Sequence, residues 1–180
     1  MRVFLDRLYL YAGYLAGAFM VAIFVLMMVL SAGRPVGINV PSGDDFVSWC
    51  MAAMAFLGLA HTFRSGEMIR VGLLIDKLPE HTRHWVELVC LVIGTGFVGF
   101  FAFYAVKMNY ESYKFHDMSQ GVVAIPMWIP QIGYSLGLVV LLIAFVDELI
   151  HVATGHLPRY EKPKPKTAEE VVERAIQSGV

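Results

Sequence analysis

Four long stretches of this chain contain no Asp, Glu, Lys or Arg: residues 8–33, 46–63, 88–106 and 118–146. An α-helix rises about 1.5 Å per residue, so even the shortest stretch, the second, reaches roughly 27 Å, close to the ~30 Å thickness of a bilayer's hydrocarbon layer. Hydrophobic residues make up 57% of the chain and charged residues 16%, a ratio unlike that of a soluble domain. The sequence therefore predicts an all-α membrane protein with four transmembrane helices.

The segments between these stretches are too short to bury cores of their own. We therefore divide the chain into a four-helix membrane domain, residues 1–158, and a tail, residues 159–180. This organisation excludes a soluble catalytic domain and an ATPase module, and the net charge of −1 gives no field that would attract nucleic acid. The first apolar stretch is longer than the core of a secretory signal, so we expect it to be retained as a helix.

The distribution of basic residues predicts the orientation of the helices. Of the 14 Lys and Arg residues, all except Arg34, Lys107 and Lys114 lie in residues 1–7, 64–87 and 159–180. Short basic segments stay on the cytoplasmic side of a membrane. We therefore expect the N and C termini to be cytoplasmic.

Two segments outside the apolar stretches have patterns of their own. Between helices two and three, residues 67–78 place several apolar side chains on one helical face, which predicts a short interfacial helix. In the tail, the Lys-Pro repeat of residues 161–166 favours an extended, solvated chain. Thr167 and Glu170 have the spacing of a capping box, which favours a short helix after that repeat.

No Asp, Glu, Lys or Arg lies within the four stretches, and this absence limits the chemistry that we expect. A residue that carries a proton, a cation or an anionic substrate through a bilayer is normally ionisable or polar and centrally placed. His61 is the only titratable side chain other than Cys or Tyr in these stretches. We interpret it as an interfacial hydrogen-bonding group, with a functional role as the alternative.

Catalytic and metal-binding motifs give no further candidates. The chain has no Cys-x-x-Cys and no His-Glu-x-x-His sequence. Cys50 and Cys90 fall near opposite membrane faces if helices two and three are antiparallel, too far apart for a disulfide. We expect both to be buried small apolar residues, and we expect no catalytic residue, metal or cofactor.

Small residues in two helices are candidates for close packing. Gly13 and Gly17 in helix one are four residues apart, and Gly133 and Gly137 in helix four repeat that spacing. Small side chains let the backbones of membrane helices approach closely. Contacts within the bundle and contacts with a partner protein both agree with this pattern.

Charged residues near the helix ends form two further candidate sites. Arg64, Glu67 and Arg70 follow helix two and suit a lipid phosphate or a carboxylate of a partner subunit, although such charges also serve to fix topology. The outer loops carry a mixed-sign group that is either a solvated rim or a docking patch for an extracytoplasmic protein. Its candidate docking residues are Asp44, Asp45, Lys114 and Asp117.

Four patches carry a family resemblance through their order and spacing. They are Asp44-Asp45 before helix two, residues 64–71 after it, Glu111-Ser112 in the second outer loop, and residues 125–130 before helix four. Together they resemble the small membrane subunit (DctQ type) of tripartite ATP-independent periplasmic (TRAP) transporters, over nearly the whole chain. One departure is Met68, which stands where the family often has a histidine.

The resemblance implies a function that depends on partners. In this family the small subunit pairs with a large permease subunit (DctM type), which holds the substrate and sodium sites, and a periplasmic solute-binding protein (DctP type) delivers an organic acid. The resemblance thus implies a non-catalytic scaffold in a sodium-driven symport system for organic acid uptake. It also implies a multi-pass protein of the bacterial inner membrane, in contact with membrane lipids.

Two other functions stay open on the sequence alone. One is a small membrane anchor of a haem- or quinone-linked redox complex. A b-type haem requires two facing histidines deep in the bundle, whereas the four stretches contain only His61. The other is a small transporter that assembles from this chain alone. The sequence does not identify the transported solute.

Overall fold

The computed structural model describes residues 2–37, 40–65 and 80–154, and these residues are mainly helical. Four helices are long and apolar enough to cross a membrane: α1 (Arg2–Gly33), α2 (Gly43–Ser65), α4 (Glu80–Phe115) and α5 (Trp128–Ala153). A short 3₁₀ helix, η1 (Arg34–Val36), follows α1. The predicted all-α class with four transmembrane helices is confirmed.

The helices extend beyond the charge-free stretches at several ends. α4 begins at Glu80 and ends at Phe115, so it carries charged residues in its first and last turns. α5 begins at Trp128 and places Pro130 in its first turn, where the missing N–H of proline leaves no helical hydrogen bond unmade. Its last two turns contain Asp147 and Glu148. The charged residues of the described chain therefore lie toward the two ends of the helices.

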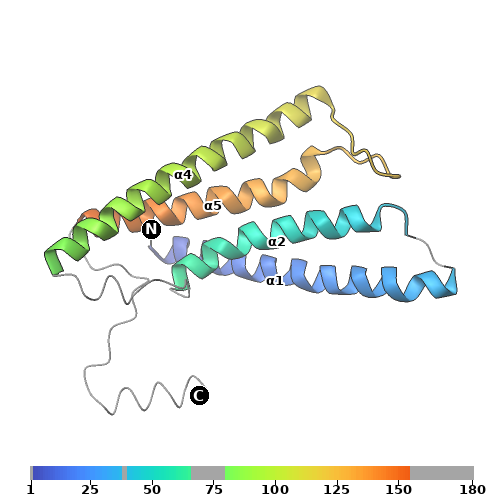
Figure 1. Cartoon of the computed structure of the whole chain (residues 1–180), viewed down its shortest axis with the longest axis horizontal. Helices are drawn as coiled ribbons and strands as arrows, with labels where there is room; N and C mark the ends of the chain where they lie inside the picture. Colours follow the sequence, from blue (N-terminus) through green and yellow to red (C-terminus); the bar gives the residue numbers. More distant parts are fainter. Residues whose placement is uncertain (1, 38–39, 66–79, 155–180) are drawn as a thin grey trace, which may run out of the picture.

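The helices form a curved row rather than a closed bundle. Figure 1 shows them side by side in the order α1, α2, α5, α4, and the packing contacts follow the same order. α2 and α5 occupy the centre, whereas α1 and α4 lie on the two flanks. The helices run side by side, so the domain has two ends along the helix axes. The end that holds Arg64, in the last turn of α2, is called the Arg64 end below, and the opposite end, which holds Trp49, is called the Trp49 end.

The buried core connects more helices at one end of the domain than at the other. Toward the Arg64 end, one apolar cluster joins all four helices and includes Tyr9 of α1, Phe63 of α2, Leu91 of α4 and Val152 of α5. Farther from that end, one cluster has its buried residues on α1 and α2 and another on α4 and α5, and Val140 of α5 and Phe56 of α2 pack against them from the neighbouring central helix. The helices consequently converge at the Arg64 end and spread toward the Trp49 end, as Figure 1 shows.

Two of the helix contacts follow a strict seven-residue repeat. On α1, the positions that alternate in steps of three and four are all buried or half-buried, and α2 is its main neighbour. They are Tyr9, Ala12, Ala16, Phe19, Ile23, Leu26, Leu30 and Gly33. The same steps on α4 give the buried or half-buried Leu88, Leu91, Thr95, Val98, Ala102, Ala105, Asn109 and Ser112, on the helix whose neighbour is α5. This spacing is that of left-handed knobs-into-holes packing.

The glycine pair of α5 lies directly against α2. A methyl group at Gly133 would lie 2.6 Å from the Cβ of Ala53, and one at Gly137 would lie 2.5 Å from the carbonyl carbon of Phe56. Only a residue without a side chain permits this approach of the two backbones. Gly133 and Gly137 therefore serve the interface between the two central helices.

The glycine pair of α1 is divided between two environments. Gly13 packs against the imidazole ring of His61 on α2, and a methyl group at Gly13 would lie 2.8 Å from the Cγ atom of that ring. Gly17 has no neighbouring atom within 4 Å of the same position and is exposed. Because His61 is half-buried against α1, it contributes to helix packing.

The expectation that both cysteines are buried is wrong for one of them. Cys50 is half-buried on α2, whereas Cys90 is exposed on α4, and both are free thiols. α4 has neighbours on one side only, so residues on its outer side are uncovered by the rest of the described chain. The exposed Phe97, Phe100 and Phe103 lie on the same helix, while Gly94 faces Phe145 of α5.

Several expectations fall outside the described residues. These are the interfacial helix at residues 67–78, the Lys-Pro repeat and short helix of the tail at residues 159–180, and the position of Met68.

Substitution of Gly137 by Ala tests the close approach of α2 and α5. We expect Gly137→Ala to lower the free energy of unfolding by about 1–3 kcal/mol, because the added methyl group overlaps the α2 backbone. Gly96→Ala on α4 is the matched control, since nothing lies within 4 Å of that position. It should leave stability unchanged or raise it slightly through better helix propensity. Unfolding in detergent measures both, and equal stabilities would contradict this packing.

Candidate functional site

Charged side chains from three helices meet at the Arg64 end. The Arg64 guanidinium on α2 donates a hydrogen bond through Nη2 to Oδ1 of Asp6 on α1, at 2.9 Å. Its Nη1 atom lies 3.8 Å from Oε2 of Glu148 on α5. Arg64 is in the last turn of α2, where the helix dipole favours a positive charge. One arginine therefore links α1, α2 and α5.

The two carboxylates that Arg64 contacts differ in exposure. The side chain of Glu148 is 3% exposed, whereas that of Asp6 is 53% exposed and that of Arg64 is 26% exposed. An exposed ion pair contributes about 0–1 kcal/mol, because water screens the charges. Removing one partner of a buried pair costs about 3–5 kcal/mol, since it leaves a buried charge behind. The contact with Glu148 is thus the more buried of the two and the one expected to contribute more to stability.

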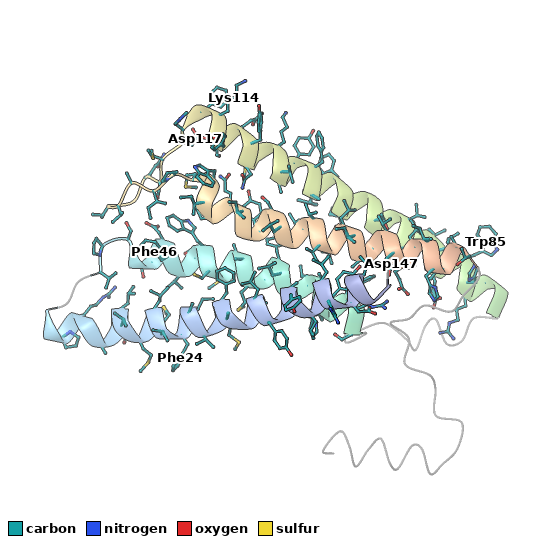
Figure 2. The ribbon with its side chains drawn as sticks, turned by 180° about the vertical axis from the view of Figure 1, so that it is seen from behind. Phe24, Phe46, Trp85, Lys114, Asp117 and Asp147 are labelled. Atoms are coloured by element: carbon teal, nitrogen blue, oxygen red, sulfur yellow. The ribbon has the colours of Figure 1, made fainter. Side chains whose placement is uncertain are left out.

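A second charged pair lies on α4 at the same end. Nε of Arg83 lies 3.3 Å from Oε1 of Glu87, one helical turn away. The Glu87 side chain is only 5% exposed. In Figure 2, Trp85 of α4 and Asp147 of α5 mark this end of the row. Buried acidic groups therefore occur on both α4 and α5 here.

Glu87 and Glu148 were not among the residues predicted from the sequence, although a signal for one of them was present. Glu87 lies directly before the third charge-free stretch, and Glu148 lies two residues after the fourth. Glu148 follows the buried positions Leu141 and Ala144 at helical spacing and precedes the buried Val152. An acidic residue in the register of a core stripe indicates a buried carboxylate with a basic partner.

The predicted group of Arg64, Glu67 and Arg70 is only partly described. Arg64 binds Asp6 and Glu148 of its own chain. Glu67 and Arg70 lie outside the described residues. Contact of this group with a lipid or a large subunit stays a prediction.

The loop between α4 and α5 forms a small hairpin at the Trp49 end. The N–H of Ser119 donates to the carbonyl of Ile125 at 2.8 Å, and the N–H of Met127 donates to the carbonyl of Asp117 at 2.9 Å. These bonds flank an antiparallel bridge between Met118 and Pro126. The loop backbone is therefore held in a defined shape.

This hairpin reaches the start of α2, although the two segments are far apart in the sequence. The N–H of Val123 donates to Oγ of Ser42 at 3.0 Å. A side chain at Gly121 would collide with the Asp45 carboxylate and the Ser42 hydroxyl, so glycine permits this approach. The hairpin and the residues before α2 thus form one surface.

Two open grooves lie on this surface and share Asp45, Gln120 and Gly121. The first has a volume of about 420 Å³ and also includes Asp44 and Arg34. The second has a volume of about 600 Å³ and also includes Asp117 and Trp49. The structure therefore brings three of the four candidate docking residues, Asp44, Asp45 and Asp117, to the same pair of grooves.

Lys114, the fourth candidate, lies outside both grooves. It is exposed in the last turn of α4, with its ammonium 5.8 Å from the centre of the Phe115 ring. Figure 2 shows Lys114 and Asp117 at the same end of the row. The grooves therefore contain three carboxylates, Asp44, Asp45 and Asp117, and one arginine, Arg34.

Neutral polar side chains that the sequence patterns did not single out lie between α4 and α5. The Ser135 hydroxyl donates to the carbonyl of Ala105 at 3.4 Å, and Nδ2 of Asn109 donates to the carbonyl of Trp128 at 3.2 Å. Hydrogen bonds of this kind hold membrane helices together. These groups therefore join the two helices.

The chemistry available in the described chain is that of packing and charge pairing. Within residues 2–37, 40–65 and 80–154, no three His, Cys, Asp or Glu side chains gather as metal ligands. The ion pairs lie at the helix ends, and the middle of each helix is apolar or neutral. The fold and this charge distribution define a multi-pass membrane protein.

Comparison with known families identifies the kind of membrane protein to which this chain belongs. The model of the family described as "Tripartite ATP-independent periplasmic transporters, DctQ component" matches residues 20–155. The match covers most of the chain, so the protein belongs to this family and is a small subunit of a TRAP transporter. No individual curated protein matches the chain. The family predicted from the four sequence patches is thereby confirmed.

Replacement of Arg64 tests the link between the helices at the Arg64 end. We expect Arg64→Met to lower the free energy of unfolding by about 3 kcal/mol, because Glu148 loses its partner on α2. Asp6→Asn, which removes only the exposed partner, should cost less than about 1 kcal/mol. Denaturation in detergent micelles compares the two variants. A loss for Arg64→Met no larger than that for Asp6→Asn would show that Glu148 does not depend on Arg64.

Proposed function

We propose that this chain is the non-catalytic scaffold of a sodium-driven TRAP importer of an organic acid. It would pair with a large permease subunit of the DctM type and serve a periplasmic binding protein of the DctP type, in the inner membrane of a bacterium. That the chain is part of a TRAP transporter follows from its family membership. The observation that carries the scaffold role is the location of the charged groups, which lie at the helix ends and leave the middle of the membrane domain without them.

The neutral polar groups between α4 and α5 support this proposal. An organic acid needs a positive charge or free N–H and O–H donors, and Na⁺ needs several oxygen ligands. The Ser135 hydroxyl and the Asn109 amide already donate to backbone carbonyls between α4 and α5. Solute and ion sites therefore belong to the large subunit in this proposal.

The close packing of the helices supports the role of a rigid component of the transporter. The two central helices approach at Gly133 and Gly137 so closely that a methyl group would overlap a neighbour. At the Arg64 end, one guanidinium and one apolar cluster connect the helices. A conformational change between α2 and α5 would break these contacts together, so the moving part of the transporter would lie elsewhere.

The basic-residue distribution supports an orientation in which the Arg64 end faces the cytoplasm. The acidic grooves at the Trp49 end would then face the periplasm, where the binding protein arrives. Family membership favours this function over the redox-anchor alternative.

Reconstitution tests the scaffold role. We expect the large subunit to co-purify with this chain, and we expect sodium-driven uptake in liposomes to require both. This chain alone should give no uptake, because the proposal assigns the solute and sodium sites to the large subunit. Uptake by the large subunit and binding protein at an unchanged rate without this chain would contradict the proposal.

Charge reversal at the grooves tests the docking of the binding protein. We expect Asp44→Lys, Asp45→Lys and Asp117→Lys each to raise the binding-protein concentration for half-maximal uptake several-fold, since the groove loses charge complementary to a basic surface. Lys114→Glu tests the fourth candidate, which lies outside the grooves. Glu111→Lys is the matched control, because Glu111 is exposed and pairs with Lys107 of its own helix. Equal effects of the control and the groove variants would contradict docking at the grooves.

A further inference from the structure

The hairpin between α4 and α5, residues 117–127, is held in place by hydrogen bonds rather than by a buried core. None of its residues is buried. Val122 is 85% exposed and Met118 is 55% exposed, and in the described chain these are the two exposed large apolar residues outside the four long helices. Segments with few buried apolar contacts are the ones that open locally at low cost in free energy. The hairpin therefore has the physical character of a segment that moves.

The hairpin nevertheless keeps its own shape. Its two halves are joined by the backbone hydrogen bonds from Ser119 to Ile125 and from Met127 to Asp117. The N–H of Gly121 also donates to Oγ of Ser119, at 3.3 Å. Because these bonds lie within the hairpin, they are kept when it moves. Motion of the hairpin is then a rotation of the whole unit about its two ends.

The backbone is strained on both sides of the contact between the hairpin and α2. Ser42, directly before α2, has a φ of 57°, and His116, directly before the hairpin, has a φ of 56°. In the described chain they are the two residues other than glycine with a positive φ, a region that side chains disfavour. Such conformations persist only where neighbouring contacts hold them, and they cluster at clamps and switch segments. Strain is therefore stored where the hairpin meets α2.

A hydrogen bond between neutral groups attaches the hairpin to α2. The N–H of Val123 donates to Oγ of Ser42 at 3.0 Å. Beside it, Gly121 rests on the Asp45 side chain, since a methyl group at Gly121 would overlap the Asp45 carboxylate. A neutral hydrogen bond at a half-exposed site is exchanged for bonds to water at a small net cost. We call the bond between Ser42 and Val123 the latch.

The tip of the hairpin separates the two grooves at the Trp49 end. Both grooves include Asp45, Gln120 and Gly121. Asp44 lines only the first groove and Asp117 only the second, so carboxylates lie on both sides of the tip. Lifting the tip away from Asp45 would join the two grooves into one. It would also uncover the Asp45 carboxylate, which is half-buried in this structure.

We propose that the hairpin is a movable strap over the candidate docking site, which lies on Asp45 in this structure and lifts from α2 when the periplasmic binding protein docks. This inference rests on the proposed function, which supplies the binding protein. A partner shifts a conformational equilibrium through contacts that it makes in one state and not in the other. Here the uncovered Asp45 carboxylate is the additional contact, and the latch sets how often the strap is open before docking.

Distances between pairs of spin labels test the motion in the complex of full-length chains. One pair is placed at the exposed Val122 of the hairpin and the exposed Ser48 of α2, and the matched control pair at Ser48 and the exposed Glu111 of α4. The free thiols are first removed by Cys50→Ala and Cys90→Ala. We expect the binding protein to lengthen the distance from 122 to 48 and to leave the distance from 111 to 48 unchanged. An unchanged distance from 122 to 48 with the binding protein bound would overturn the strap.

Removal of the latch tests the strap without the binding protein. Ser42→Ala removes the acceptor for Val123, so the population with a long distance from 122 to 48 should rise several-fold. Ser31→Ala, at an exposed serine of α1, is the matched control and should change nothing. No change for Ser42→Ala would contradict the latch. If the binding protein does not bind the unmodified complex, the proposed function fails, and this measurement alone decides whether the hairpin lifts.

A reversible crosslink tests whether lifting is needed for uptake. A Cβ atom at position 121 would lie 2.8 Å from Oγ of Ser42, so Ser42→Cys with Gly121→Cys suits a disulfide across the contact. In the oxidised form we expect the binding-protein concentration for half-maximal uptake to rise several-fold, and reduction should restore it. The reduced form carries the same two substitutions and is therefore the control. Equal values for the oxidised and reduced forms would show that the strap does not have to lift.

Discussion

The hydrocarbon layer of a bilayer offers no water to polar groups, and the structure of this protein follows from that constraint. Each membrane-crossing segment forms a helix because only a helix satisfies every backbone N–H and C=O within the segment. Charged side chains are confined toward the helix ends, where α2 carries Asp44 at one end and Arg64 at the other. With water unable to drive one apolar surface against another, the helices associate through close packing, of which the contact at Gly137 is the tightest example.

The two ends of the row have different physical characters and suit different tasks. At the Arg64 end, Arg64 with the carboxylates of Asp6 and Glu148 and a shared apolar cluster connect the helices. At the Trp49 end, the helices spread, and the hairpin is attached to the start of α2 through the Ser42 hydroxyl. A structure that is held together at one end and open at the other provides both a stable support and an accessible surface.

Much of the fold could be predicted from the sequence, because charged side chains are excluded from the hydrocarbon layer of a membrane and their absence marks the segments that cross it. The four helices followed from the charge-free stretches, and the family followed from patches such as Asp44-Asp45 and residues 125–130. The candidate site was less accessible. Glu148 was missed because its burial depends on which side of α5 the other helices cover. The exposure of Cys90 depends on α4 having a neighbour on one side only.

The sequence by itself determined how many times this chain crosses a membrane and where the crossings lie, because hydropathy is a local property that each segment carries alone. The tertiary structure alone decided the order of the helices, which glycines are packed and which are open, and which acidic residues share the grooves with Asp45. These features depend on which helix lies next to which, and that choice arises from the fit of side chains that are distant in the sequence.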